Sequence, residues 1–281
     1  MSQKLDRRLT PARSDLAASY LKGQVEADCF KDGAPMEVRE CIVDVRREPR
    51  PDAAVDTQVL FGERVEVYDE EEGWVWVQLD NDQYVGWIAA NTLWSKLSRP
   101  THRVCVPRTF IYPRPSIKLP PLLALPLGAE VEVIERRGDF WMTTNSCFIY
   151  ASHLTQLDES FPDFVAIAEK LLNAPYLWGG KSWMGIDCSG LVQLSLLMRG
   201  YKAPRDSDLQ EQQVGKPIDY NAGLQRGDLI FWKGHVGIMR DESTLLHANG
   251  THMLVSSEPL SLVRDRNLQA GAGDITSYRR L

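Results

Sequence analysis

The sequence has no long apolar run. Its longest aliphatic-rich segment, residues 119–127, is interrupted by three prolines. Because a helix needs roughly 20 consecutive apolar residues to cross a bilayer, we expect no membrane-spanning helix and no membrane partner. The first residues include basic side chains, but no apolar stretch and no small-residue cleavage site follow them. This pattern differs from an export signal and predicts a cytoplasmic protein.

An excess of positive charge is also absent. The chain carries 32 Lys and Arg residues against 38 Asp and Glu residues, which gives a net charge of −6. A negative protein gains no general attraction to the phosphates of nucleic acids or to anionic lipids. We therefore expect no nucleic-acid partner.

Cysteine is scarce and irregularly spaced. The five cysteines form an odd set without a C-x-x-C pair, which argues against a disulfide framework and a redox motif. Structural zinc usually requires closely spaced ligand pairs. The pair His247 and His252 has no matching cysteine pair, so zinc is a weak alternative. Neither a metal nor a cofactor is expected.

The length of 281 residues predicts more than one domain. Residues 1–37 are mostly polar and are assigned to an accessory segment with one short helix over residues 14–22. Ser14 can cap that helix and Gly23 can end it.

Alternating strands follow this segment. Apolar and polar residues alternate over residues 64–68, 74–78 and 83–88, with turn residues between them. The series recurs in degenerate form, because residues 62–67 are echoed by 128–133 and residues 90–93 by 151–154. Short strands joined by tight turns predict two small all-β barrels, over residues 38–98 and 99–157.

The last segment, residues 158–281, has a different periodicity. Apolar residues recur at helical spacing over residues 161–172, and a second apolar helix follows Cys188. Strand patterns come next, around residues 229–232, 236–240 and 244–248. Helices followed by antiparallel strands predict an α+β domain.

Cys188 is the strongest candidate for a catalytic residue. It stands where a Gly-rich loop turns into an apolar helix, and free N–H groups and the helix dipole stabilise a thiolate there. We therefore expect a thiol that ionises near neutral pH. Downstream, His235 begins one strand and His247 lies on the next, so the two can be neighbours on one face of a hairpin. A nucleophile, a base and a group that orients the base are what covalent catalysis requires.

These motifs resemble the NlpC/p60 family of papain-like cell-wall peptidases. The similar segments are P-Y-L-W-G-G, G-I-D-C-S-G-L, G-D-L-I-F and G-H-V-G-I. The resemblance implies a papain-like catalytic domain with Cys188, His235 and His247 as its triad. Tyr176 would direct its hydroxyl group toward the oxyanion. The preceding barrels resemble bacterial SH3-like domains, with G-W-I-A-A-N-T-L closing the first.

Members with this domain order resemble γ-D-glutamyl-L-diamino acid endopeptidases of the dipeptidyl-peptidase VI type. That resemblance implies cleavage after γ-D-Glu in peptidoglycan-derived tripeptides and tetrapeptides with a free N-terminal L-Ala. Since no export signal is found, we expect the reaction to serve recycling of wall fragments inside the cell. It also implies a set of substrate-binding residues. These are Glu63, Tyr84, Asp187, Ser189, Asp206 and Ser207.

Two other functions remain open on the sequence. One is a wall-binding module without activity, although all three triad residues are present. The other is a papain-like acyltransferase or amidase with a different substrate. The preferred diamino acid, the oligomeric state and any ligand of the second barrel are not predicted.

Overall fold

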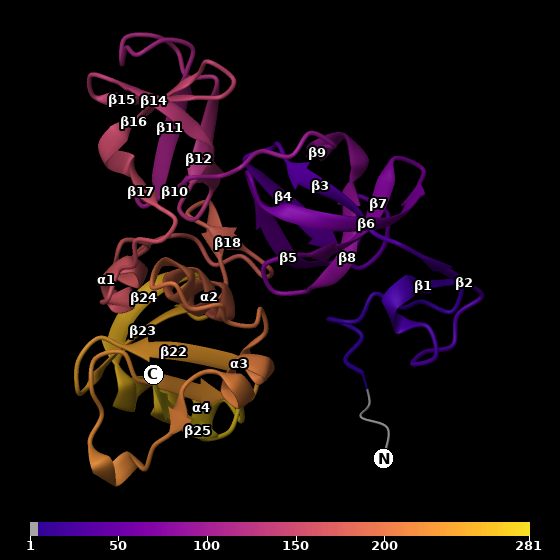
Figure 1. Ribbon diagram of the computed structural model, residues 1–281. Coiled ribbons are helices and arrows are strands. Elements are labelled where there is room, and N and C mark those ends of the chain that lie inside the picture. Colours follow the sequence, from indigo (N-terminus) through magenta and orange to yellow (C-terminus); the bar gives the residue numbers. More distant parts are fainter. Residues whose placement is uncertain (1–4) are drawn as a thin grey trace. The chain divides into compact units, whose positions relative to one another are not determined.

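The computed structural model describes residues 5–281 (Figure 1). The chain divides into two compact units, which are described separately. One contains the residues up to Val104 together with Arg108–Gln156, and the other contains Cys105–Pro107 and Leu157–Leu281. No helix among the described residues is both long enough and apolar enough to span a bilayer.

The N-terminal segment contains no α-helix over residues 14–22, so that prediction is wrong. It forms the strand β1 (Leu16–Ala18), the short 3-10 helix η1 (Ser19–Leu21) and the strand β2 (Cys29–Lys31), which pairs in parallel with β1. Tertiary packing overrides local helix propensity here. The apolar side chains of this segment are buried in a cluster with three aromatic residues of the first barrel, namely Tyr68, Trp76 and Trp87.

Arg13 also attaches this segment to the barrel. Its guanidinium carbon lies 4.5 Å from the ring centroid of Trp76 and 5.0 Å from that of Trp87. The same guanidinium forms ion pairs of 2.6 Å with Asp15 and with Asp69. A cation over two indole rings combines electrostatic attraction with apolar contact.

The first barrel is one sheet in the order β5-β4-β8-β7-β6-β3-β9. Its alternating residues bury a core of valine and leucine side chains. The barrel begins at Ala34, four residues before the predicted boundary at 38, because β3 pairs with β6 and β9. Its elements are β3 (Ala34–Val38), β4 (Ile42–Arg46), β5 (Val55–Leu60), β6 (Arg64–Glu71), β7 (Trp74–Leu79), β8 (Val85–Ala89), η2 (Ala90–Thr92) and β9 (Leu93–Trp94).

The next β region repeats the local conformation of the first barrel. Gly62 and Gly128 both have positive φ angles, of 82° and 89°. The echoed segments at 90–93 and 151–154 both form one turn of 3-10 helix followed by a strand. Its elements are β10 (His102–Val104), β11 (Arg108–Tyr112), β12 (Leu123–Pro126), β13 (Glu130–Val131), β14 (Val133–Arg137), β15 (Phe140–Thr143), β16 (Phe148–Tyr150), η3 (Ala151–His153) and β17 (Leu154–Gln156). They form a three-stranded and a five-stranded sheet.

The C-terminal unit has a six-stranded sheet in the order β20-β25-β21-β22-β23-β24. Helix α2, which is buried along its whole length, packs against β22 and β23 (Figure 1). The helices are α1 (Phe164–Glu169), shorter than predicted, α2 (Cys188–Met198), α3 (Ser207–Gln213), α4 (Leu260–Gln269) and the 3-10 helix η4 (Tyr220–Ala222). The strands are β18 (Lys181–Ser182), β19 (Gly185–Ile186), β20 (Lys216–Pro217), β21 (Leu229–Trp232), β22 (His235–Met239), β23 (Thr244–Asn249), β24 (Leu254–Pro259) and β25 (Ser277–Arg280).

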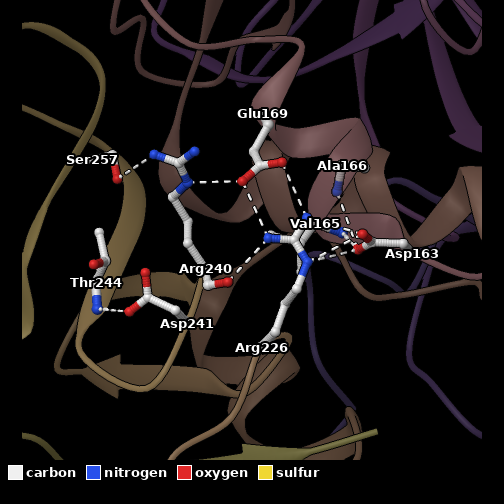
Figure 2. A network of polar contacts seen from close by, with 9 residues as sticks. All are labelled: Asp163, Val165, Ala166, Glu169, Arg226, Arg240, Asp241, Thr244 and Ser257. Atoms are coloured by element: carbon white, nitrogen blue, oxygen red, sulfur yellow. Dashed lines mark hydrogen bonds and ion pairs between the residues drawn. The ribbon is translucent and has the colours of Figure 1, made fainter.

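A network of ion pairs attaches α1 to this sheet (Figure 2). The guanidinium of Arg226 binds the carboxylates of Asp163 and Glu169, at 2.9 and 3.0 Å. Arg240 donates to the same Glu169 at 2.8 Å and to the hydroxyl of Ser257 at 3.0 Å. Because Asp163 also accepts the N–H groups of Val165 and Ala166, the network caps α1 as well as anchoring it.

Candidate active site

Cys188 is the first residue of α2 and is buried. The preceding residue, Asp187, is the N-cap, and its Oδ1 accepts the N–H of Gly190 at 2.7 Å. The Gly-rich loop packs closely on this first turn, since a Cβ atom on Gly190 would lie 2.5 Å from the carbonyl oxygen of Gly180. Cap and loop together fix the cysteine where the helix begins, as the sequence predicted.

The pKa of the Cys188 thiol differs from the expectation that this group ionises near neutral pH. Burial, followed by the charge of Asp187, raises the pKa of Cys188 to about 12, although N–H groups of Val236 and Ser189 act in the opposite direction. Burial also lowers the pKa of His235 to about 3. Each group alone therefore favours its neutral form in the folded site.

His235 and His247 are hydrogen-bonded to each other. The register of β22 with β23, in which Ile238 lies opposite Leu246, places them as diagonal neighbours on one face of the sheet. His235 Nε2 lies 2.8 Å from His247 Nδ1. The ring of Trp232, opposite His235 on β21, lies 5.7 Å away between centroids. The contact predicted between base and orienting residue is thus present.

The sequence analysis did not identify Glu258, which lies on the far side of His247. Its Oε1 is 2.9 Å from His247 Nε2. Arg266 of α4 binds the same carboxylate with both of its terminal nitrogens, at 2.7 and 2.8 Å. No local signal identifies this contact, because it depends on a turn over residues 250–253 that pairs Asn249 with Leu254 and so makes His247 and Glu258 diagonal neighbours.

A cavity of about 290 Å³ opens beside the two histidines. Its lining includes Tyr176, His235, His247 and Arg266. The backbone N–H of Tyr176 donates to the carbonyl of Met253 at 2.9 Å, which holds the residue in place. Burial, then the charge of Cys188, raises the pKa of Tyr176 to about 12. The tyrosine hydroxyl is therefore protonated at neutral pH and lies within electrostatic reach of the nucleophile.

Asp187 and Ser189 take part in a buried ion pair that the sequence analysis did not foresee. Arg205, which is 1% exposed, donates to both carboxylate oxygens of Asp187, at 2.9 and 2.7 Å, and to the Ser189 hydroxyl at 2.9 Å. The N–H of Gly179 adds a further bond to Asp187 at 2.9 Å. This arrangement gives Asp187 and Ser189 structural roles beside the nucleophile, and their role in substrate binding stays a prediction.

The other proposed binding residues occupy separate places. Asp206 is the N-cap residue of α3 and Ser207 is its first residue, and both are partly exposed. Glu63 and Tyr84 belong to the first barrel and are 8% and 5% exposed. The Oε2 of Glu63 accepts the N–H of Leu60 at 2.7 Å, so this carboxylate is not a solvated surface charge. Binding of substrate by these four residues stays a prediction.

The described residues, 5–281, hold no group of three or more His, Cys, Asp or Glu side chains arranged for a metal ion. The zinc alternative raised by the sequence therefore gains nothing from the structure. Among the five cysteines, Cys188 is the buried one.

Comparisons with known proteins find two matching domains and several similar chains. Residues 45–93 match the bacterial dipeptidyl-peptidase SH3 domain, and residues 173–270 match the NlpC/P60 family. The chain is 30% identical over 233 residues to a gamma-D-glutamyl-L-lysine dipeptidyl-peptidase of Bacillus subtilis (strain 168), which covers 71% of this chain and 74% of that relative. A protein of the same name from Bacillus cereus is 29% identical over 238 residues, which covers 74% and 71%.

One solved structure supports the fold. An NlpC/P60 family protein from Bacillus cereus ATCC 10987 superimposes with a TM-score of 0.73 at 21% identity. The superposition covers 88% of this chain and 99% of that chain. The two chains thus share a fold over most of their length.

Proposed function

Because this chain belongs to the NlpC/P60 family, we propose that it is a cysteine peptidase that hydrolyses an amide bond in peptidoglycan stem peptides. The observation that carries the proposal is the arrangement of Cys188 at the start of α2 beside the hydrogen-bonded pair His235 and His247. We further propose that residues 158–281 are a papain-like α+β domain and that residues 99–157 form a second SH3-like barrel.

The reaction follows from the residues of the site. The sulfur of Cys188 attacks the amide carbonyl while its proton passes to His235. The Tyr176 hydroxyl and the N–H of Cys188 donate to the oxyanion. His235 then protonates the departing amine, and water hydrolyses the acyl-enzyme. The contact of 2.8 Å between His235 and His247 and the protonated state of the Tyr176 hydroxyl support these steps.

For the substrate, we propose the bond between γ-D-Glu and the diamino acid in peptides with a free N-terminal L-Ala. The dipeptide L-Ala-D-Glu is released. The names of the two Bacillus relatives support this choice. A desolvated ammonium needs a carboxylate partner, and Glu63 and Asp206 are the acids proposed for it. The other substrate-binding residues that we propose are Tyr84, Asp187, Ser189 and Ser207. Recycling of wall fragments in the cytoplasm is the proposed setting, which fractionation of cells would test.

Product analysis tests the reaction. The wild-type protein and C188A are incubated with L-Ala-γ-D-Glu-L-Lys and with the corresponding diaminopimelate peptide, and the products are identified by mass spectrometry. Release of L-Ala-D-Glu by the wild type alone is expected. Equal activity of C188A would reject a cysteine peptidase, an acyl group transferred to another amine would indicate an acyltransferase, and binding without products would indicate a wall-binding module.

A second experiment tests the ammonium site. Acetylation of the L-Ala amine should greatly reduce turnover, and E63Q should raise KM for the free peptide. Glu37 provides a matched control, since it is a buried carboxylate of the same barrel whose Oε2 accepts the N–H and hydroxyl of Ser98. E37Q should leave KM unchanged. Comparable turnover of the acetylated peptide would refute the proposed recognition of a free amine.

A further inference from the structure

The row of polar side chains across β22, β23 and β24 continues beyond the proposed triad. His235, His247 and Glu258 lie on one face of three adjacent strands, joined by contacts of 2.8 and 2.9 Å. The register explains the row, because Ser256 lies opposite His247 and Leu245 lies opposite Glu258, which makes His247 and Glu258 diagonal neighbours. The row ends at Arg266 of α4, which donates hydrogen bonds to both carboxylate oxygens of Glu258.

The carboxylate determines which nitrogen of His247 carries the proton. Burial lowers the pKa of His247, the hydrogen bond and charge of Glu258 oppose this shift, and the charge of Arg266 adds to it, so the neutral ring predominates at pH 7. Arg266 lowers the pKa of Glu258 to about 2, so Glu258 is ionised and can only accept hydrogen bonds. Since a neutral imidazole has one donor and one acceptor, His247 donates from Nε2 to Glu258 and accepts at Nδ1.

The tautomer of His247 in turn determines the tautomer of His235. Because His247 Nδ1 accepts, the Nε2 atom of His235 must be the donor in the contact of 2.8 Å. The proton of neutral His235 is therefore on Nε2, and Nδ1 is the basic nitrogen. This is the form that can accept a proton from Cys188. The opposite tautomer of His247 would present a donor to His235 and reverse the assignment.

We propose that Glu258, held by Arg266, is a positioning residue that sets the tautomers of His247 and His235 and so leaves Nδ1 of His235 free to deprotonate Cys188. The inference rests on the proposed role of Cys188 as nucleophile but on no particular substrate. The charged or titratable groups that face Glu258 are His247 from β23, Arg266 from α4 and His252 from the preceding turn, whose Nε2 is 3.3 Å from Oε1.

Alkylation by iodoacetamide tests the proposal without any peptide. The sulfur of Cys188 forms a bond to the methylene carbon, iodide leaves, and the thiol proton passes to His235. The rate is measured from pH 5 to pH 10 for the wild type, E258L and E258Q, in each case in a background where the other four cysteines are serine. Circular dichroism checks that each variant is folded.

E258L removes the acceptor, so we expect its alkylation at pH 7 to fall about 10- to 100-fold, the usual effect of removing a partner that orients a functional histidine. The difference between wild type and variant should narrow toward pH 10, because the growing ionised fraction of the thiol reacts without the base. E258Q retains an acceptor oxygen and should recover most of the lost rate. An equal rate for E258L and wild type at pH 7, or an equal loss at every pH, would overturn the proposal.

A second variant keeps the test valid if E258L does not fold. R266M removes a cation whose charge lowers the pKa of His247. The ring should therefore become protonated at a higher pH, and the fall in alkylation rate on the acid side of the pH profile should move to higher pH. The matched control is D274N, which removes another bidentate carboxylate partner of an α4 arginine, Arg264, with contacts of 2.7 and 2.6 Å. D274N should leave the profile unchanged, and an unshifted profile for R266M would refute the assigned role of the pair. If peptide hydrolysis fails while these shifts appear, only the proposed substrate is wrong.

Discussion

Replacement of Arg205 by Met should be among the most damaging single changes in the C-terminal unit. Arg205 is 1% exposed and contributes hydrogen bonds to Asp187, Ser189 and the Gly180 carbonyl. Its loss would leave the buried carboxylate of Asp187 without its cation. Removing one partner of a buried ion pair costs roughly 3–5 kcal/mol. An exposed pair such as Arg264 and Asp274 contributes far less, because water screens both charges.

Urea unfolding, followed by circular dichroism, would measure these differences. R205M should lose about 3–5 kcal/mol in the free energy of unfolding. The double variant D187N/R205M should be more stable than R205M, because the uncompensated charge is gone and Asn can still cap α2. R264M is the control and should change the free energy of unfolding much less than R205M does. A loss below about 1 kcal/mol for R205M, or a double variant less stable than R205M, would refute the reasoning.

Three further predictions concern the same unit. Y176F should lower kcat about 10²-fold, the usual cost of one oxyanion donor, with KM little changed in steady-state kinetics; a change in KM alone would contradict this role. His235 has a pKa lowered from 6.5 to about 3, so its contribution to stability is present above pH 6.5 and is lost as the pH falls toward 3. The free energy of unfolding of the wild type, measured in urea, should therefore fall between pH 7 and pH 5 by at most about 1.4 kcal/mol per pH unit. H235Q should show a smaller change of this free energy with pH. G190A should lower the melting temperature although alanine favours helices, because its Cβ would lie 2.5 Å from the Gly180 oxygen; a higher melting temperature would refute that clash.

The sequence predicts features whose cause is local. A cysteine after a Gly-rich loop and before an apolar run marks the start of α2, and short, mostly apolar runs bounded by turn residues mark the strands that carry His235 and His247. The repeat of residues 90–93 at 151–154 appears again as two matching turns of 3-10 helix. In these cases the neighbouring residues along the chain supply the information.

The remaining features depend on contacts between distant residues. Residues 14–22 have the cap and stop signals of a helix, yet β1 pairs with β2 and buries Leu16 against the barrel. Glu258 precedes a helix in the sequence and resembles a surface residue. Its contact with His247 depends on the register of a hairpin whose turn includes Met253 at a φ of 53°. Arg205 likewise meets Asp187 only after the chain has folded.

Because Arg13 contacts two tryptophans of the first barrel, their fluorescence can report whether the N-terminal segment is attached to that barrel. The guanidinium covers the indole rings of Trp76 and Trp87, with centroid distances of 4.5 and 5.0 Å. Release of the segment would replace a fixed cation by mobile water at both rings, and indole emission is sensitive to such a change in polarity. The fluorescence spectrum of a chain that begins at β3 would therefore report how firmly the segment is attached, and R13Q would separate the cation from the apolar contacts.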